Sequence, residues 1–174
     1  MATFLLELAK LTIPGVLVLL AAYYILKDLL NNQERNRYYE LKKETAKNLN
    51  PIRLTAYERL ALFLERIQPD SMILRVQNNS MKVKDLHIAL LATVREEFEH
   101  NVTQQIYVSN DVWAVTKNAK ESIIQLINTC ASDIPDELPA IELAKIIIER
   151  YGSIETTPVD MALEILKKEV KSFY

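Results

Sequence analysis

His87 and His100 are the side chains in this sequence best suited to binding a metal or moving a proton. We expect both on one helix, 13 residues apart, which at about 100° per residue places them roughly 140° apart around the axis. One helix therefore cannot direct both imidazoles at one metal ion. Glu97 precedes His100 at the i, i+3 spacing of di-iron carboxylate bundles. Those sites need a second such pair and two further glutamates, and the sequence contains no second ExxH.

Acidic side chains surround His100, at Glu96, Glu97 and Glu99. We interpret this cluster as a solvated helix face, because acids at helical spacing usually mark exposed surfaces. The alternative is a membrane-bound enzyme with a site assembled from dispersed residues, in which a pocket joins Glu97 or His100 to other acids and arginines. Nothing in the sequence selects a pair of carboxylates for acid–base work. We therefore predict a protein that is not an enzyme, with no catalytic, cofactor-binding or metal-binding residue and no cofactor.

The sequence contains two glycines, Gly15 and Gly152, and one cysteine, Cys130. A phosphate-binding loop, a dinucleotide-binding turn and a nucleophile elbow each need clustered glycines, so all three are excluded. A single cysteine excludes an internal disulfide and a cysteine-rich zinc site, and we interpret Cys130 as a small buried apolar residue. Tight turns also need glycine, so its scarcity favours an all-α fold.

The formal net charge of −2 is unevenly distributed along the chain. Residues 1–50 hold seven Lys and Arg against five Asp and Glu, whereas residues 51–174 hold 14 against 18. Domains that bind nucleic acid usually carry a basic stripe. The mildly acidic balance after residue 50 therefore indicates no nucleic-acid partner.

An uncharged run of 16 residues, 11–26, lies between Lys10 and Lys27. As a helix it would cover roughly 24 Å, less than the hydrocarbon layer of about 30 Å, but lysines can extend from both ends to the interface. We predict a membrane anchor at 1–30 with a transmembrane span at about 11–30. A cleaved signal peptide and a buried helix of a soluble domain are the alternatives.

Basic residues are more frequent after this run than before it. Only Lys10 precedes the run, and the residues that follow are Lys27, Arg35, Arg37, Lys42, Lys43 and Lys47. Lys and Arg near a span remain on the cytoplasmic side. We therefore predict a single-pass protein of the bacterial inner membrane, with its N-terminus outside and its C-terminal domain in the cytoplasm.

Polar and apolar periodicity divides the rest of the chain into helices. Residues 31–50 read as a polar helical stalk that ends at Asn50–Pro51, because the residue before a proline disfavours helix. Residues 51–174 read as a cytoplasmic bundle of about five helices. The expected ranges are 52–68, 82–106, 111–131, 140–151 with Gly152 just beyond its end, and 158–173. Within each range, apolar residues three and four apart form a stripe that should face the core. Ser109 is the expected cap of the helix at 111–131, and Thr157, followed by a proline and by Asp160, marks the start of the last helix. The predicted fold is all-α: a transmembrane helix that continues into a stalk, followed by this small bundle.

Three stretches carry a family resemblance: YERLALFLERIQP at 57–69, VREEFEHNVTQQIYVS at 94–109, and the W-x3-K-x2-K of Trp113, Lys117 and Lys120. Together they resemble an uncharacterised family of single-pass, membrane-anchored helical proteins from Bacteroidetes-type bacteria. The resemblance covers essentially the whole chain. It implies an N-terminal span, a helical cytoplasmic region and a bacterial setting, and it brings no assigned activity.

These observations favour a non-enzymatic, membrane-tethered scaffold, adaptor or accessory subunit of a bacterial inner-membrane complex. Its expected partners are the lipid bilayer and either another protein or further copies of itself, bound through the span, the stalk or the helical domain. A dispersed-site enzyme is one alternative function. A membrane-surface or lipid-responsive regulator, acting through the stalk and residues 4–10, is another. The four acids interleaved with the basic residues of the stalk argue against specific lipid binding there.

Overall fold

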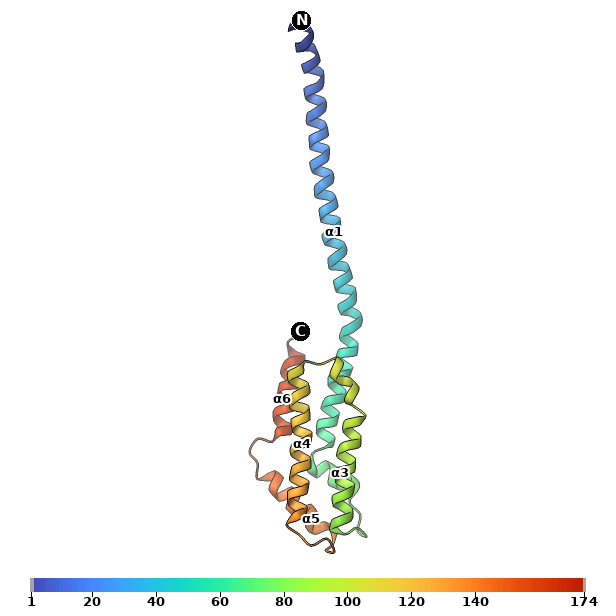
Figure 1. Ribbon diagram of the computed structural model, residues 1–174, viewed down its shortest axis with the longest axis vertical. Coiled ribbons are helices and arrows are strands. Elements are labelled where there is room, and N and C mark those ends of the chain that lie inside the picture. Colours follow the sequence, from blue (N-terminus) through green and yellow to red (C-terminus); the bar gives the residue numbers. More distant parts are fainter. Residues whose placement is uncertain (1, 174) are drawn as a thin grey trace. The chain divides into compact units, whose positions relative to one another are not determined.

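The structure, a computed structural model, describes the backbone of residues 2–173. Side chains are left out of the description at residues 1–14, 16, 18, 21, 22, 31, 36, 38, 41–48 and 174. Every regular element within residues 2–173 is a helix (Figure 1), so the predicted all-α class is confirmed. In order these are α1 (Ala2–Arg66), α2 (Pro69–Val76), α3 (Val83–Glu99), the 3₁₀ helix η1 (Val102–Ile106), α4 (Asn110–Ser132), α5 (Ala140–Gly152) and α6 (Pro158–Lys171).

The chain divides into two compact units, Met1–Leu49 and Asn50–Tyr174. The first consists of the N-terminal part of α1, on which the predicted anchor and stalk both lie. Among the residues with described side chains, no helix is long and apolar enough to cross a membrane. The predicted span, 11–30, falls partly outside those residues.

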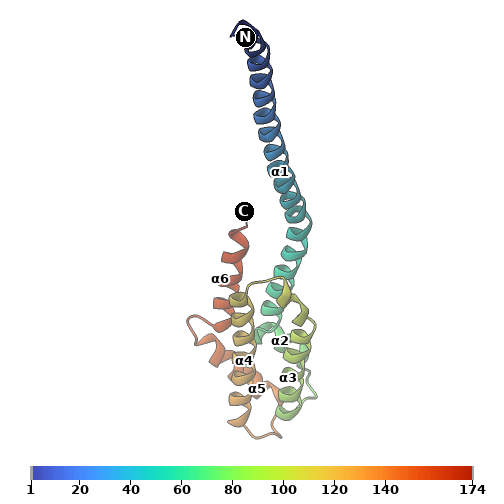
Figure 2. The ribbon, with the colours of Figure 1, turned by 45° about the horizontal axis from the view of Figure 1, so that its top comes forward.

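The second unit is a helical bundle with one hydrophobic core. Figures 1 and 2 show α3, α4 and α6 side by side, and α5 contacts both α3 and α4. The predicted apolar stripes supply the core because side chains three and four apart share one face of a helix. Its largest fully buried side chains are Tyr57, Phe63, Leu60, Leu64, Ile67, Met72, Leu86, Leu90, Ile123, Ile127, Leu143 and Ile147. The single cysteine, Cys130, is buried in this core, as predicted.

Side-chain caps begin two of the helices, at the positions that the sequence indicates. Ser109 accepts a hydrogen bond from the backbone N–H of Val112 at the start of α4. Thr157 and Asp160 form a capping box at the start of α6, with a proline at the first helical position. Each cap satisfies N–H groups that have no partner within the helix.

The predicted helix end at Asn50–Pro51 is wrong, because α1 continues through this position to Arg66. A proline fixes φ near the helical value and costs its helix one hydrogen bond and some crowding against the preceding turn. The residues that follow, including Ala56, Tyr57 and Leu60, are buried and stabilise the part of α1 after Pro51. The helix therefore includes Pro51 at this cost.

The predicted helix 82–106 is also wrong in its length, because α3 ends at Glu99 and a separate 3₁₀ helix begins at Val102. The Asn101 side chain donates a hydrogen bond to the Glu97 carbonyl at 2.8 Å. Asparagine competes with the backbone for such bonds and thereby breaks helices.

Gly152 was expected just beyond the end of its helix, in the left-handed conformation that glycine favours there. In the structure Gly152 is the last residue of α5, and Ser153 closes the helix with a right-handed backbone, φ −79°. No described residue has a positive φ. The α5 terminus therefore closes by tightening its last turn.

Candidate functional site

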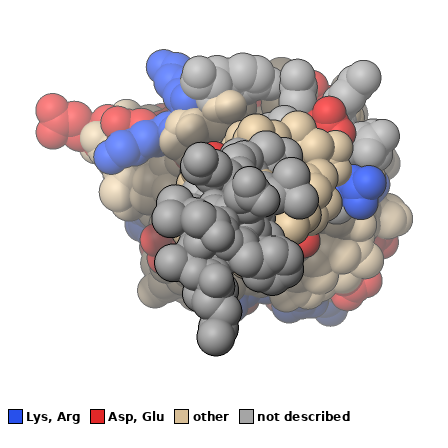
Figure 3. Space-filling view, turned by 90° about the horizontal axis from the view of Figure 1, so that it is seen from above, with Lys and Arg blue, Asp and Glu red and all other residues tan. Residues whose placement is uncertain are grey.

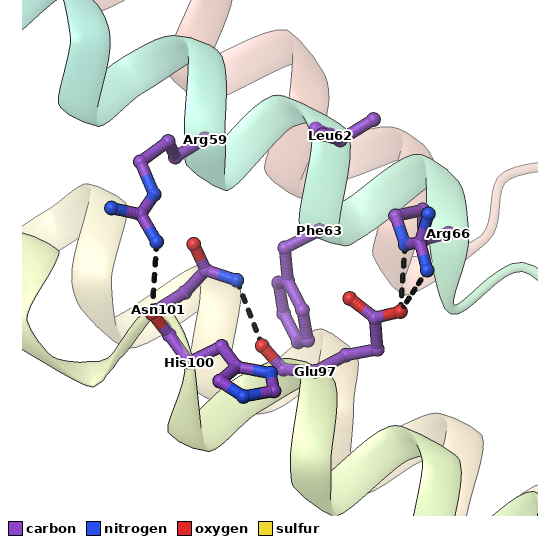
Figure 4. Close-up of a pocket in the computed structure, with 7 residues that line it drawn as sticks. All are labelled: Arg59, Leu62, Phe63, Arg66, Glu97, His100 and Asn101. Atoms are coloured by element: carbon purple, nitrogen blue, oxygen red, sulfur yellow. Dashed lines mark hydrogen bonds and ion pairs between the residues drawn. The ribbon is translucent and has the colours of Figure 1, made fainter.

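A pocket of about 210 Å³ lies where α1 meets the end of α3 (Figure 4). Its lining residues are Arg59, Leu62, Phe63, Arg66, Glu97, His100 and Asn101. The pocket joins Glu97 and His100 to two arginines, the arrangement expected for a site assembled from dispersed residues. This makes it the best candidate for a functional site in the part of the chain that the structure describes.

Helical spacing explains which side chains reach the pocket. Arg59, Leu62 and Arg66 follow one another at three and four residues along α1, so they share one face. Phe63 lies beside that face and is buried, and its ring forms the floor of the pocket in Figure 4. The pocket therefore has an apolar floor and two basic side chains on its α1 wall.

Glu97 is held by two guanidinium groups. The Arg66 Nε donates to Glu97 Oε1 at 2.7 Å, and Arg75 Nη1 of α2 lies 3.6 Å from the same oxygen. The carboxylate is 18% exposed, and its hydrogen bond raises the pKa of Arg66. Glu97 therefore fastens α1 and α2 to α3 through these ion pairs.

Arg59 has a structural partner too. Its Nη2 donates to the carbonyl of His100 at 3.2 Å, at the C-terminal end of α3. Carbonyl groups at a helix end have no partner within the helix and carry partial negative charge, so a guanidinium there is favourable. Arg59 has further N–H groups beyond this one bond, and these can bind an acidic group at the pocket.

The pocket does not contain a metal-binding constellation. Among the described residues, no three His, Cys, Asp or Glu side chains come together as metal ligands would. His87 lies elsewhere, with its Nε2 2.8 Å from Asn128 Oδ1 of α4. The two histidines that the sequence places on one helix thus contact different parts of the bundle, and Glu97 is the one acid that lines the pocket.

A second polar cluster, which the sequence did not reveal, joins α1, α4 and α6. The Glu169 carboxylate accepts hydrogen bonds from the hydroxyls of Tyr57 and Ser109 and from the Ser109 N–H at 3.2 Å. Arg53 donates to the Tyr57 hydroxyl at 3.3 Å and to the Tyr107 carbonyl at 3.1 Å. The capping pattern marks Ser109, but no local signal identifies Glu169 as its partner 60 residues later.

The surroundings shift two ionisations in this cluster. Burial and the Glu169 hydrogen bond raise the pKa of Tyr57 to about 12. Burial would raise the pKa of Glu169, but the hydrogen bonds from Ser109 and Tyr57 outweigh it, so that pKa lies below its ordinary value. Both shifts favour a neutral phenol that donates to a charged carboxylate. Such an arrangement holds three helices together and offers no exposed nucleophile or base.

Two residues of the W-x3-K-x2-K stretch pack around one aromatic ring. Trp113 stacks on Phe98 with ring centroids 5.4 Å apart. The Lys120 ammonium lies 4.5 Å from the centroid of the same ring and forms an ion pair with Glu121 at 2.6 Å. These contacts join α3 to α4.

Charged groups of both signs lie on the surface. Figure 3 shows Lys and Arg atoms interspersed with Asp and Glu atoms among the described residues of one face. The exposed ion pairs Arg150–Asp133 and Lys145–Glu142 have the same mixed character. Such a surface favours local, pair-by-pair recognition over attraction by one large charged patch.

Neither the curated proteins nor the solved structures give a match to this chain. One family model spans nearly all of it, residues 3–173, and that family has no assigned function, as the resemblance in the sequence implied. The chain therefore belongs to the DUF7935 family, a family of unknown function.

Proposed function

We propose that this protein is a non-enzymatic scaffold or accessory subunit of a bacterial inner-membrane complex, tethered by its N-terminal helix. Its helical domain, in the cytoplasm, binds a protein partner at the surface around the Arg59–Glu97 pocket. The observation that carries this proposal is the exposed stripe of Arg59, Leu62 and Arg66 over that pocket.

The tether rests on the sequence. Residues 11–26 carry no charge and are bounded by Lys10 and Lys27. These residues belong to α1, which also contributes buried side chains to the core of the second unit. A helix satisfies its own backbone hydrogen bonds, as the hydrocarbon layer requires. The excess of basic residues after the run supports a cytoplasmic domain.

The composition of the stripe favours binding over catalysis. Leu62 is 59% exposed between two arginines, and arginine beside apolar side chains is typical of binding hot spots. The acid that lines the pocket, Glu97, is already paired with Arg66 and Arg75. What remains is a shallow site with one net positive charge, suited to a partner's carboxylate next to an apolar side chain.

The test is affinity purification of the tagged full-length protein in mild detergent, with mass spectrometry of stoichiometric companions. We expect the wild type to retain a defined companion and an Arg59→Gln, Leu62→Ser variant to lose it. A matched Ile88→Ser, Arg95→Gln variant changes two exposed residues of the same types on α3 and should retain it.

Two results would overturn the proposal. Purification of the wild type alone, as a monodisperse monomer, would remove the accessory-subunit function. Retention of the companion by both variants would show that it binds elsewhere on the molecule. Thermal unfolding of each variant checks that the lost bond from Arg59 to the His100 carbonyl has not unfolded the domain.

A dispersed-site enzyme is the second candidate, because the pocket does bring His100 and Glu97 to one place. It requires a ligand that contacts the His100 ring. A screen of small anions and amino acids by thermal shift tests it, with His100→Gln as the comparison. A compound that stabilises the wild type and not the variant would favour this candidate.

A further inference from the structure

A second cavity, of about 290 Å³, forms a groove between α1 and α6. Its walls are mostly apolar, and charged side chains stand only on its rims. Glu58 lines it from α1, whereas Lys167 and Lys171 line it from α6. The complete lining is Leu54, Tyr57, Glu58, Ala61, Leu166, Lys167, Val170 and Lys171. We call this cavity the α1–α6 groove.

The α1–α6 groove has the form that receives a helix. Leu54 and Ala61 lie seven residues apart on α1, which is about two turns or 10.5 Å of helix. Two helical walls with an apolar floor accept the apolar edge of a third helix, whose anchors recur at three, four and seven residues. The positive rim on α6 selects a helix that carries an acid beside those anchors.

The exposed edge of α5 on the same chain has these properties. Ile141 and Ile148 are each 45% exposed and lie seven residues apart, so their spacing equals that of the groove. Glu149 is exposed next to Ile148. Glu142 already forms an ion pair with Lys145 at 3.1 Å, which leaves Glu149 as the acid available to a partner's lysine.

We propose that the α5 edge of one copy docks in the α1–α6 groove of a second copy. Ile141 and Ile148 fill the groove, and Glu149 pairs with Lys167 or Lys171. The two surfaces are different, so a pair of copies keeps one free groove and one free edge, and the contact builds a ring or an open chain. This goes beyond the scaffold function, since a chain that binds no other protein could still pair with its own copies.

Disulfide cross-linking in native membranes tests the contact on the full-length protein. Cells co-express two differently tagged forms, one with Ile148→Cys and one with Ala61→Cys, and a mild oxidant is added. Cys130 is buried and does not interfere. We expect a disulfide that joins the two tags only when both substitutions are present. The control pairs Ala61→Cys with Ile88→Cys, which is 57% exposed on α3 and should give no product.

A charge exchange then identifies the register. Lys171→Glu or Glu149→Lys alone should lower the cross-link yield at least about threefold, because like charges would face each other, and the two together should restore it. Both residues are exposed, so neither substitution threatens the fold. The same exchange is made with Lys167 in place of Lys171, because either lysine of the α6 rim can face Glu149. The proposal is overturned if Ile148→Cys links to no groove position, if it links to a second Ile148→Cys instead, or if neither charge exchange restores the yield.

Discussion

Replacing Glu169 by alanine removes the carboxylate on which three segments of the bundle converge. In the wild type its two oxygens accept the hydroxyls of Tyr57 and Ser109 and the Ser109 N–H. Tyr57 is only 1% exposed, so water cannot easily replace the lost partner. The Ser109 hydroxyl also caps α4, and it loses the acceptor that orients it.

The expected cost follows from the bonds removed. A hydrogen bond to a charged group contributes about 1.5–3 kcal/mol, and a neutral one about 0.5–1.5. Three bonds to the charged carboxylate would sum to about 4.5–9 kcal/mol. Glu169 is only partly buried, and Tyr57 keeps its bond from Arg53, so the net cost should lie below that sum. We expect Glu169→Ala to lower the free energy of unfolding by about 2–4 kcal/mol at neutral pH.

The assay is urea unfolding followed by the fluorescence of Trp113, the only tryptophan, which stacks on Phe98 in the bundle. Glu164→Ala is the matched control on α6, because Glu164 is exposed; its stability should stay within about 0.5 kcal/mol of the wild type. If Glu169→Ala also stays within about 0.5 kcal/mol of the wild type, the hydrogen bonds of Glu169 do not stabilise the bundle as we argue.

The pH dependence gives a second check on the same variant. The pKa of Glu169 is lower in the folded protein than its ordinary value of 4.5. Its contribution to stability is therefore complete above pH 4.5 and is lost as the pH falls through the folded pKa. The difference in free energy of unfolding between the wild type and Glu169→Ala should therefore become smaller below pH 4.5. A difference that grows below pH 4.5 would contradict a lowered pKa for Glu169.

Three further predictions concern single side chains. Burial raises the pKa of Tyr57 from 10.0 to about 12. The free energy of unfolding of the wild type should therefore fall as the pH rises from 10 to 12, and Tyr57→Phe, which cannot ionise at this position, should show a smaller fall. Thr157→Ala, which removes the capping box of α6, should cost about 1 kcal/mol in urea unfolding, whereas Thr129→Ala on an exposed face should cost less than about 0.5. Burial raises the pKa of the Cys130 thiol, so a thiol reagent should modify it only in step with the loss of Trp113 fluorescence.

Short-range patterns predicted most of the bundle. Apolar spacing identified the core faces of α3 and α4, and the positions of Ser109 and Thr157 fixed two helix starts. These signals are local, because a cap or a stripe depends on residues within one or two turns. The helix boundaries were wrong at Pro51, where the helix includes a proline, at Asn101, whose side chain turns back on its own helix, and at Gly152, which is the last residue of α5.

The candidate pocket was foreseen only in part. The spacing of Glu97 and His100 was interpreted as a solvated helix face, and a pocket with arginines was expected only for the enzyme alternative. In the structure Glu97 is 18% exposed and ion-paired, and no pattern indicated that Arg66 and Arg75 would both hold it. Ion pairs between helices depend on how the helices cross, which a single sequence does not encode in any fixed spacing. The Glu169 cluster was missed for the same reason, since its partners lie 60 and 112 residues away.

The scarcity of glycine explains why the polar residues of this bundle are engaged in holding it together. No described residue adopts the left-handed conformation that commonly ends a helix, so helix ends must find partners among side chains or tightened turns. Arg59 supplies one at the end of α3, and Ser109 and Thr157 supply others. The two surfaces for which we propose binding, the stripe of Arg59, Leu62 and Arg66 and the α1–α6 groove, are instead partly apolar, as docking surfaces for helices and proteins commonly are.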